Sequence, residues 1–431
     1  MEKLKIALLG LGNVGSGVYK ILTTNKKIIE KRSGYEIEVA KILVRNKNKK
    51  RNVDVDSSLI TTNFEDILND DEISIVVELI GGENPAKDYI LKSLEKKKHI
   101  VTANKLLMAK CGTEIFKKAQ EIGCVHVCYE ASVAGGIPII QGINEALTGN
   151  KIQQVIGILN GTTNYILSEM DTKGMSFEAA LKDAKAKGYA EADPTSDIEG
   201  FDAVYKLDIL TALCFNKKVA DDKIFREGIT KISKCDIELA KEFGYKIKLL
   251  AIGKINDGKL EISVHPAMIP TDHPLANVNG SYNAIMIKGD AVGDLMFYGK
   301  GAGDLPTGSA VVGDIISVAK NLNNKPNCLD LFDENDDEIL KDFGDSVAEY
   351  YLRMNVLDTP GTLAEITSLF ALNKISILSL IQRGNRTDGK TDIIFMTHKT
   401  KEKSIRSFVK AFENLTDKFK VENIIRIENL D

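Results

Sequence analysis

The sequence predicts an α/β protein built from three successive domains. Three observations carry this prediction. Strand and helix patterns alternate over residues 1–130, helical patterns then precede strand-like runs over 131–320, and the order βαββαβ can be read in 345–431. A chain of 431 residues is too long for one ordinary core, so several domains are expected.

The first domain is expected to hold a parallel, doubly wound sheet, because strands and helices alternate. Continuous apolar runs such as KIALLG and SIVVELIG are typical of strands buried on both faces. We expect strands at 4–9, 36–44, 74–79, 99–102 and 125–129. Helical periodicity falls at 14–30, 86–97 and 106–121.

The second domain is expected to be α+β, with a mixed or antiparallel sheet. Helices are expected at 138–147, 162–170, 176–187 and 200–215. Strand-like runs follow at 246–255, 259–269, 284–292 and 295–300, and the turn Asn256-Asp257-Gly258 favours antiparallel pairing. A last helix, expected after Gly299 and through about Leu322, would complete the first domain over about 300–322.

An acidic, irregular stretch at 323–338 is the best candidate for a linker. Beyond it we expect a strand at 348–358, a helix at 361–372, strands at 375–383 and 391–398, a helix at 402–415 and a strand at 421–428. This order is the ferredoxin-like arrangement, and the turn NRTDGK at 385–390 suits its central hairpin.

Composition excludes several classes of partner. The chain has 57 basic and 61 acidic residues, and a net charge of −4 offers no footprint for nucleic acid or an anionic membrane. No apolar run approaches the roughly 20 residues of a membrane helix, and a strand pattern begins at once without a signal peptide. Six scattered cysteines indicate reduced thiols and a cytoplasmic protein. Cys124, His126 and Cys128 share one face of a strand-like run; buried strand residues are favoured there over a metal site.

The glycine motif at the first turn predicts dinucleotide binding. Gly10 permits a tight turn after the strand KIALL, Gly12 lets the backbone approach a pyrophosphate, and Gly15 allows the helix to pack closely on the strand. Asn13 and Val14 open that helix, whose free N–H groups favour an anion. In this strand–turn–helix context the motif indicates a Rossmann-type domain, and an ordinary glycine turn is the alternative.

The end of the second strand bears on the choice between NAD and NADP. A carboxylate there would accept from the ribose 2′-hydroxyl, but the sequence reads Val44-Arg45-Asn46-Lys47. Arg45 could bind a 2′-phosphate with its planar guanidinium, so NADP is preferred while NAD stays possible. A merely solvated basic loop is the alternative.

Carboxylates gather between Ala184 and Lys206, in a run that Pro194 and glycines break into a loop. A loop with so many carboxylates suits a cation or an ammonium group, and Asp202 and Lys206 share a helix face at i and i+4. A surface loop with one helix ion pair explains the same residues.

This run resembles the signature of the homoserine dehydrogenase family at every constrained position. The matching residues are Ala184, Gly188-Tyr189-Ala190, Asp193-Pro194, Asp197-Ile198, Gly200, Asp202 and Lys206. The segments ASVAGGIPII, LNGTTNYIL and GKGAGDLPTGSAVVGD extend the resemblance over roughly the first 320 residues. It implies NAD(P)-dependent interconversion of L-homoserine and L-aspartate 4-semialdehyde, on the route to threonine, isoleucine and methionine. No kinase-like stretch occurs ahead of the glycine motif, so the resemblance is to the monofunctional form.

The resemblance also assigns roles to individual residues. Lys206 is implied as the acid/base at the substrate oxygen, and Lys105 as a second lysine near nicotinamide and substrate. Two converging lysines would lower each other's pKa, although Lys105 could also be a plain helix-start lysine. The implied substrate-binding residues are Glu191, Asp202, Asp197 and Thr162. Gly188, and Gly303 in the GKGAGD loop, are the further implied contacts to the cofactor.

The resemblance further implies a bound monovalent cation, which in this family is usually sodium. Its ligands would be the carboxylate of Glu130 and oxygens of Val133, Gly135 and Ile137. Hard oxygen ligands suit such a cation, but the residues alone would read only as a turn.

The C-terminal domain resembles an ACT domain. Its run Asn355-Val-Leu-Asp358-Thr359-Pro360-Gly361 leads into a helix, where Thr362 and Glu365 fit a capping box and Leu363, Ile366, Leu369 and Phe370 fall on one face. The implied effector is threonine, with Asp358, Gly361 and Asn373 as contacts, and a purely structural oligomerisation module is the alternative. The resemblance implies a dimer or tetramer.

Two other functions are alternatives to the dehydrogenase. A non-enzymatic amino-acid sensor would not need Lys105, Lys206 or the complete signature. An aspartate semialdehyde dehydrogenase would need a nucleophilic cysteine with a nearby histidine, and Cys111, Cys124 and Cys128 offer no such context.

Overall fold

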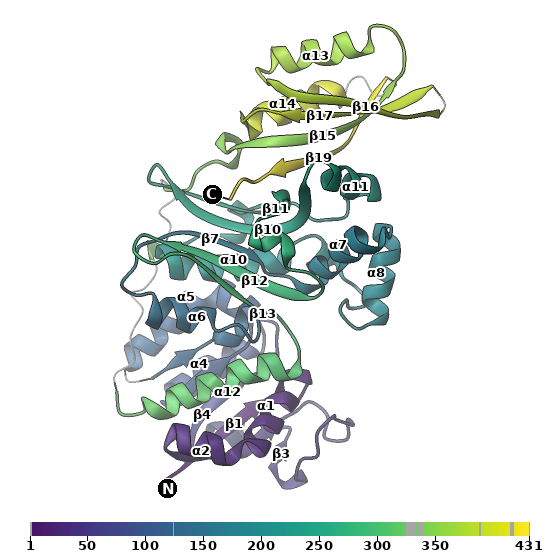
Figure 1. Ribbon diagram of the computed structural model, residues 1–431. Helices are drawn as coiled ribbons and strands as arrows, with labels where there is room; N and C mark the ends of the chain where they lie inside the picture. Colours follow the sequence, from purple (N-terminus) through teal and green to yellow (C-terminus); the bar gives the residue numbers. More distant parts are fainter. Residues whose placement is uncertain are drawn as a thin grey trace. The chain divides into compact units, whose positions relative to one another are not determined.

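The computed structural model describes residues 2–123, 125–324, 333–334, 339–387, 389–413 and 418–430. The chain forms two compact units, which are described separately. Unit 1 comprises Met1–Val155, Tyr205–Asp221 and Asn283–Asn335, and unit 2 comprises Ile156–Val204, Asp222–Tyr282 and Asp336–Asp431. Figure 1 traces the elements along the chain.

A six-stranded, wholly parallel sheet forms the centre of unit 1. Its order is β3-β2-β1-β4-β5-β6, the doubly wound order that the alternating pattern predicts. The strands are β1 Glu2–Leu9, β2 Tyr35–Leu43, β3 Ile60–Thr61, β4 Ile73–Glu78, β5 His99–Thr102 and β6 Val127–Cys128. The predicted strand at 125–129 is thus reduced to two residues.

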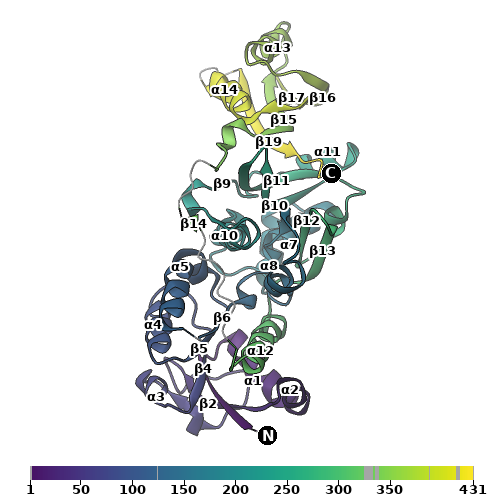
Figure 2. The same ribbon diagram turned by 90° about the vertical axis from the view of Figure 1, so that its left-hand side faces the viewer.

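Helices cover both faces of this sheet (Figure 2). One face carries α1 Asn13–Thr24, α2 Lys26–Ser33 and α12 Asp304–Lys320, whose apolar residues share a core with Ile6, Leu8 and Val77. The other face carries α4 Ala86–Glu95 and α5 Lys105–Ile122, and a short helix, α3, spans Glu65–Leu68.

The prediction of a single helix over 14–30 is wrong, because α1 ends before Asn25 and α2 begins after it. The hydroxyls of Thr23 and Thr24 bond to carbonyls of the preceding turn, and Asn25 caps α1 before α2 begins. Side chains of this type compete with the backbone for hydrogen bonds and favour helix ends.

Most of the remaining elements of unit 1 are short. They include η2 Glu130–Ser132, α6 Ile139–Gln141, a π-helical turn η3 Gly142–Ala146, β8 Lys217–Lys218, β13 Gly293–Lys300 and β14 Asp333–Glu334, with η1 Ser57–Leu59 after the loop that follows β2. β12, Tyr282–Gly289, pairs with β13. β7, Ile152–Ile158, and α10, Phe201–Phe215, each contribute residues to both units.

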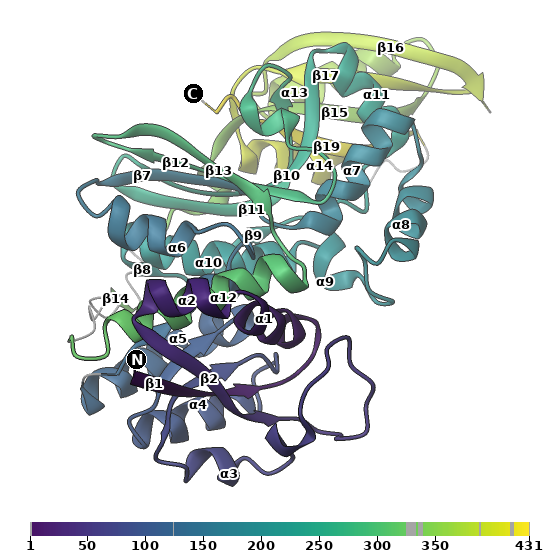
Figure 3. The same cartoon turned by 60° about the horizontal axis from the view of Figure 1, so that its bottom comes forward.

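Unit 2 combines helices with a mixed sheet, as predicted. α7 Gly161–Lys173 and α8 Phe177–Ala186 lie side by side (Figure 3). The other elements of its first part are α9 Thr195–Ile198, η4 Asp221–Lys223, β9 Phe225–Arg226, α11 Lys234–Glu242, β10 Tyr245–Asn256, β11 Lys259–Pro270 and η5 Pro274–Asn277. β10 and β11 form an antiparallel hairpin, whose turn residues Asp257 and Gly258 have φ of 50° and 76°. This is the predicted tight turn.

The C-terminal part of unit 2 has the predicted βαββαβ order. Its elements are η6 Phe343–Asp345, β15 Val347–Leu357, α13 Thr362–Leu372, β16 Ile377–Thr387, β17 Lys390–Thr397, β18 Thr400–Lys401, α14 Glu402–Glu413 and β19 Phe419–Ile427. The four long strands run in the order β19-β15-β17-β16. α13 and α14 cover one face of this sheet, where Phe370 of α13 contacts both Phe408 of α14 and Phe395 of β17. β19 also pairs in parallel with β11, so the sheet continues into the first part of the unit.

Two details of α13 correct the sequence prediction. The helix begins at Thr362, and Gly361 is its N-cap with φ of 95°, so Thr362 and Glu365 form no capping box. The Thr362 hydroxyl instead meets that of Thr359 at 3.0 Å. Ile366 and Phe370 are buried as expected, whereas Leu363 is 39% exposed.

No helix in the described ranges is long and apolar enough to cross a membrane. The predicted linker at 323–338 lies for the most part outside the described residues, as does one residue, 388, of the turn at 385–390.

Candidate functional site

The glycine turn after β1 has the geometry that a pyrophosphate requires. Gly10 has φ of 114°, and a Cβ there would lie 2.9 Å from the carbonyl oxygen of Leu79. A Cβ on Gly15 would lie 2.4 Å from the carbonyl oxygen of Gly10, whereas one on Gly12 would meet nothing within 4 Å. The first and third glycines therefore permit the packing, and the second leaves the backbone open toward a ligand. Asn13 and Val14 open α1 beside them.

A cavity of about 370 Å³ opens at this turn, and it joins the glycines to the end of β2. Gly10 and Gly12 line it, as do Arg45, Asn46 and Arg51. Arg51 is committed to the loop itself, because its guanidinium donates to the carbonyls of Asn46 (2.7 Å) and Lys49 (2.8 Å). Arg45 is exposed at the cavity wall, which leaves it the better placed guanidinium for a phosphate.

Lys105 is fixed at the carboxyl edge of the same sheet. It is the first residue of α5, and Asn104 caps the helix by accepting from the Leu107 N–H at 3.1 Å. The Asn104 amide also donates to the carbonyl of Gly82 at 2.6 Å. Ligands of doubly wound sheets bind at this edge, so the position is the expected one for a residue near the nicotinamide.

Glu78, a residue that the sequence analysis did not single out, organises this edge. It is fully buried at the end of β4, and its carboxylate accepts from the Thr102 hydroxyl at 2.7 Å and from the Ile80 N–H at 2.7 Å. Thr102 in turn accepts from the Asn104 N–H at 3.0 Å. A chain of hydrogen bonds therefore connects β4 with the start of the Lys105 helix.

Asn160 brings together two carboxylates of the signature. Its side-chain amide donates to Asp197 at 2.7 Å and to Asp202 at 2.8 Å, while its Oδ1 accepts from the Thr163 N–H at 2.8 Å as the N-cap of α7. Asn160 and Asp202 are 5% and 2% exposed. Asn160 thus acts as both helix cap and bridge.

Asp202 and Lys206 lie one turn apart on α10, as the i, i+4 spacing predicts. Lys206 is 7% exposed, so its ammonium has been withdrawn from bulk water. A buried lysine needs compensating partners or a lowered pKa, and either condition is found at functional sites more often than on surfaces.

The other predicted substrate and cofactor residues of unit 2 lie around the same loop. The Thr162 hydroxyl donates to the carbonyl of Tyr189 at 2.6 Å, which joins the start of α7 to the signature. Gly188 has φ of 75°, and Glu191 is exposed. Asp193 is engaged locally, because it accepts from both the N–H (3.1 Å) and the hydroxyl (2.6 Å) of Thr195.

The predicted cation ligands lie in one tight turn of unit 1. Glu130 is 3% exposed, and its carboxylate accepts from the N–H groups of Ile140 (2.9 Å) and Gln141 (2.7 Å). Burial raises the pKa of Glu130, because the charged carboxylate loses its contact with water. A bound cation would offset this loss. Among the described residues no backbone N–H donates to the carbonyls of Val133 or Gly135, whereas that of Ile137 accepts from Ile139 at 2.8 Å.

The GKGAGD loop packs directly on this turn. A Cβ on Gly135, which has φ of 53°, would lie 2.5 Å from the carbonyl oxygen of Gly301. Gly303, with φ of 128°, is the N-cap of α12, and α12 packs on α1 close to the glycine turn.

No cluster of three metal-ligating side chains occurs among the described residues. A cation at the Glu130 turn would therefore rely on backbone oxygens. The alternative metal site at Cys124, His126 and Cys128 cannot be placed as a set, because Cys124 lies outside the described residues. His126 contacts the carbonyl of Asn321 at 2.9 Å, and burial raises the pKa of the Cys128 thiol.

Comparison with known proteins agrees with these features. The family model for the NAD binding domain of homoserine dehydrogenase matches residues 10–130, the model for homoserine dehydrogenase itself matches 138–316, and the ACT domain model matches 350–417. A homoserine dehydrogenase of Pseudomonas aeruginosa is 41% identical over the full length of both chains. The chain belongs to the homoserine dehydrogenase family.

Solved structures of homoserine dehydrogenases share its fold. A homoserine dehydrogenase from Thiobacillus denitrificans is 42% identical with a TM-score of 0.89, covering 100% of this chain and 99% of that one. A hyperthermophilic archaeal homoserine dehydrogenase in complex with NADPH is 26% identical with a TM-score of 0.62, covering 73% of this chain and 97% of that one. The chain is therefore a homoserine dehydrogenase with an NAD-binding domain, a catalytic domain and a C-terminal ACT domain.

A contact between α5, which begins with Lys105, and α10, which carries Lys206, is another feature that the sequence analysis did not predict. Lys218 donates to the carbonyl of Ala109 on α5 and pairs with Asp208 on α10 at 3.3 Å. Asp208 is 1% exposed, and burial raises its pKa to about 6. Because Lys105 begins α5 and Lys206 lies on α10, this pair fixes the spacing of those helices within unit 1. Apart from the two consecutive lysines of β8, no feature of the sequence indicates this contact.

The predicted effector residues of the ACT domain separate into two places. Asp358 and Gly361 both lie in the loop between β15 and α13, where the Asp358 N–H donates to the carbonyl of Gly389 at 2.9 Å. Asn373 lies at the opposite end of α13, and its side chain donates to the carbonyl of Leu369 at 2.9 Å. The loop is thus the place where two of the three residues occur together.

Proposed function

We propose that this homoserine dehydrogenase interconverts L-homoserine and L-aspartate 4-semialdehyde with NADP in preference to NAD. The observation that carries the proposal is the bridge from Asn160 to Asp197 and Asp202, one turn before Lys206. This bridge fixes two carboxylates of the signature, which can bind the ammonium and hydroxyl groups of a hydroxy amino acid such as homoserine.

Lys206 is the proposed acid/base. In the oxidation of homoserine it takes the proton from the C4 hydroxyl while the carbon loses a hydride; in the reduction it returns that proton to the carbonyl oxygen. The nicotinamide, when bound, supplies the hydride chemistry. Glu191, Asp197 and Asp202 hold polar groups of the substrate, Thr162 contacts its carboxylate, and Lys105 donates to it from the sheet edge.

The proposed cofactor site uses Gly10, Gly12, Asn13, Val14 and Gly15 for the pyrophosphate. Arg45 would contact the 2′-phosphate at the wall of the 370 Å³ cavity, and the NADPH complex of the archaeal relative supports NADP. Gly188 and Gly303 are proposed as further contacts.

A monovalent cation such as sodium is proposed at the Glu130 turn. The buried carboxylate of Glu130 and the available carbonyls of Val133 and Gly135 are hard oxygen donors that suit it. Ile137 would contribute a carbonyl that already accepts one hydrogen bond. The cation's proposed part is to fix the turn on which the GKGAGD loop packs.

Threonine is the proposed effector, bound at Asp358 and Gly361 of the ACT domain, with Asn373 assigned less directly. The ACT domain supports an amino-acid ligand as a class. We further propose a homo-oligomer, a dimer or tetramer, that works in the cytoplasm on the route to threonine, isoleucine and methionine.

Initial rates with both cofactors test the proposal. Purified chain is mixed with aspartate 4-semialdehyde and either NADPH or NADH, and oxidation is followed at 340 nm with and without L-threonine. We expect turnover with both cofactors, a higher kcat/KM with NADPH, and a lower rate with threonine. Equal kcat/KM values for NADPH and NADH would contradict the proposed contact of Arg45 with the 2′-phosphate. A rate that does not change with threonine would indicate that the ACT domain is a structural module.

A further inference from the structure

A second cavity, distinct from the cofactor cavity, occurs within unit 2. It has a volume of about 540 Å³, which is the size of typical small-ligand sites. One wall is the segment 225–231, and the other is formed by α14 and β19 of the ACT domain. It lies apart from the β15–α13 loop that holds Asp358 and Gly361.

Positive charge exceeds negative charge along this cavity, with five cationic residues against two carboxylates. Arg426 is internally satisfied, because its guanidinium bonds to Glu402 at 2.7 and 3.0 Å and to Glu227 at 2.8 Å. Those bonds engage both carboxylates. Among the side chains that the structure describes, which leave out those of 413–417, no carboxylate forms an ion pair with Lys231 or Lys410, and both lysines are exposed. The charge that remains for a ligand is therefore positive.

The floor of the cavity is apolar. Phe225, Ile405, Val409 and Ile424 line it, and Phe225 stacks on Phe343 with ring centroids 3.8 Å apart. The guanidinium of Arg406 lies 5.1 Å from the centroid of the Phe225 ring. A ligand that matches both the cationic residues and the apolar floor has negative charges and an apolar or aromatic portion.

The 225–231 wall contacts the signature loop directly. Arg226 donates to the carbonyl of Glu199, and its guanidinium lies 3.6 Å from the centroid of the Phe201 ring. The Ile229 N–H donates to the carbonyl of Ile198 at 2.8 Å. A Cβ on Gly228 would lie 2.4 Å from that same carbonyl oxygen, so the two segments touch backbone to backbone.

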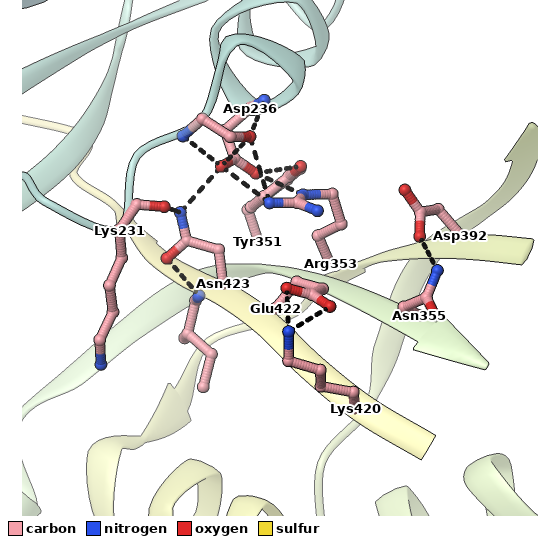
Figure 4. A network of polar contacts seen from close by, with 11 residues as sticks. Lys231, Asp236, Tyr351, Arg353, Asn355, Asp392, Lys420, Glu422 and Asn423 are labelled. Atoms are coloured by element: carbon pink, nitrogen blue, oxygen red, sulfur yellow. Dashed lines mark hydrogen bonds and ion pairs between the residues drawn. The ribbon is translucent and has the colours of Figure 1, made fainter. Parts of the chain in front are cut away.

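The opposite end of this wall is joined to the ACT sheet. Asn423 on β19 donates to the carbonyl of Lys231 at 3.1 Å and to Asp236 at 3.0 Å, and Asp236 also accepts from Arg353 at 2.8 Å (Figure 4). Asp236 is fully buried, so these contacts are held firmly. The wall thus contacts both the ACT sheet and the segment 198–201, which lies between Asp197 and Asp202 in the sequence.

We propose that this cavity is a second ligand site, for a small organic anion that carries two negative charges and an apolar portion. Lys231 and Lys410 bind its charges from opposite walls, and Phe225, Ile405 and Val409 receive the apolar portion. Lys231 ends the segment that packs on Ile198 and Glu199. A ligand bound to Lys231 would therefore affect the position of the signature segment around these two residues. The site is independent of the proposed threonine contacts.

Calorimetric titration tests this site without turnover. The full chain is first saturated with NADPH, so that its pyrophosphate site is filled, and is then titrated with phthalate or with phenyl phosphate. We expect one site per chain for at least one probe, with binding that weakens as salt is raised. Binding of phthalate alone would identify an apolar dicarboxylate as the ligand class, and binding of phenyl phosphate alone would identify a phosphorylated aromatic compound.

Charge reversal at the two lysines locates the binding. The double variant Lys231→Glu/Lys410→Glu is expected to weaken the probe roughly tenfold or more, because charge-assisted contacts from both walls become repulsive. Lys259→Glu, an exposed lysine outside the cavity, is the matched control and is expected to bind as the parent does.

Basal dehydrogenase rate and thermal midpoint establish that the variants are folded, and both are expected to match the parent. If charge reversal impairs folding, Lys231→Gln/Lys410→Gln takes its place with the same expected direction. The proposal is overturned if neither probe binds the parent chain, or if a folded double variant binds as tightly as Lys259→Glu.

Discussion

At the scale of single residues, Asn160 combines a cap with a bridge. Its Oδ1 caps α7, and its Nδ2 donates to Asp197 on α9 and to Asp202 on α10, which would otherwise repel each other. Hydrogen bonds to charged groups contribute roughly 1.5–3 kcal/mol each, so the bridge outweighs the cap. Asn160 is therefore a positioning residue for Asp197 and Asp202, the carboxylates that are proposed to bind the substrate.

Asn160→Ser separates the two roles, because serine is also a good N-cap but lacks the amide donor. We expect the thermal midpoint to stay close to that of the parent, while kcat/KM for homoserine falls roughly 10- to 100-fold, in line with the loss of one or two such bonds. The fall is expected mainly in KM for homoserine, and KM for NADPH is expected to stay unchanged. Parent-like kinetics in this variant would show that the bridge does not position the carboxylates.

Some site residues could be predicted from sequence, and others could not. Gly10, Gly12 and Gly15 were predicted individually because each glycine meets a local backbone requirement, and each shows the expected space or crowding. Asn160 and Glu78 were missed because the side chains that they bind, those of Asp197, Asp202 and Thr102, lie 24 or more positions away along the chain. An NGT triplet before a helix predicts an N-cap and gives no sign of a carboxylate bridge.

At the scale of elements, α7 is tied to the sheet by a buried lysine. Lys248 on β10 is 2% exposed, and its ammonium donates to the carbonyl of Val278 at 2.6 Å and to Asn164 on α7 at 3.1 Å. Both acceptors are uncharged, so burial is not offset and lowers the pKa of Lys248 to about 7. The sequence predicted helix and strand here, but it did not predict this tie.

Stability is expected to rise with pH through Lys248. Between pH 7 and the ordinary lysine pKa of 10.5 the unfolded chain binds more protons than the folded chain, so raising the pH favours folding. From pH 7 to 9 the free energy of unfolding is expected to gain about 2 kcal/mol from this group. Urea titrations of the parent and of Lys248→Met at both pH values measure it; equal pH slopes would contradict the assignment.

Most of the long regular elements could be predicted from the sequence. The hairpin of β10 and β11 and the six long elements of the ACT domain lie within a few residues of their predicted bounds. β7, Ile152–Ile158, was missed because its two glutamines interrupt the apolar run. The break at Asn25 was missed because helical periodicity continues across it.

At the scale of the whole chain, the ACT domain is not a detachable appendage. β19 pairs with β11, and the buried carboxylate of Asp236 on α11 is shared by Tyr351, Arg353 and Asn423 of the ACT sheet (Figure 4). The guanidinium of Arg353 and the other donors outweigh burial and hold the pKa of Asp236 below its usual range. These partners are more than 100 positions apart, so no local pattern could have predicted them.

The central claim is that Lys206, buried on the signature helix, moves the proton of the reaction. Its most direct test is the steady-state rate of NADPH oxidation by aspartate 4-semialdehyde in Lys206→Ala, with Lys182→Ala, an exposed lysine of α8, as the matched control. We expect Lys206→Ala to fold and to bind NADPH like the parent, but to lose about 10²- to 10⁴-fold in kcat, the usual contribution of a general acid. Lys182→Ala is expected to keep the parent rate. A folded Lys206→Ala enzyme that turns over at the parent rate would contradict the account.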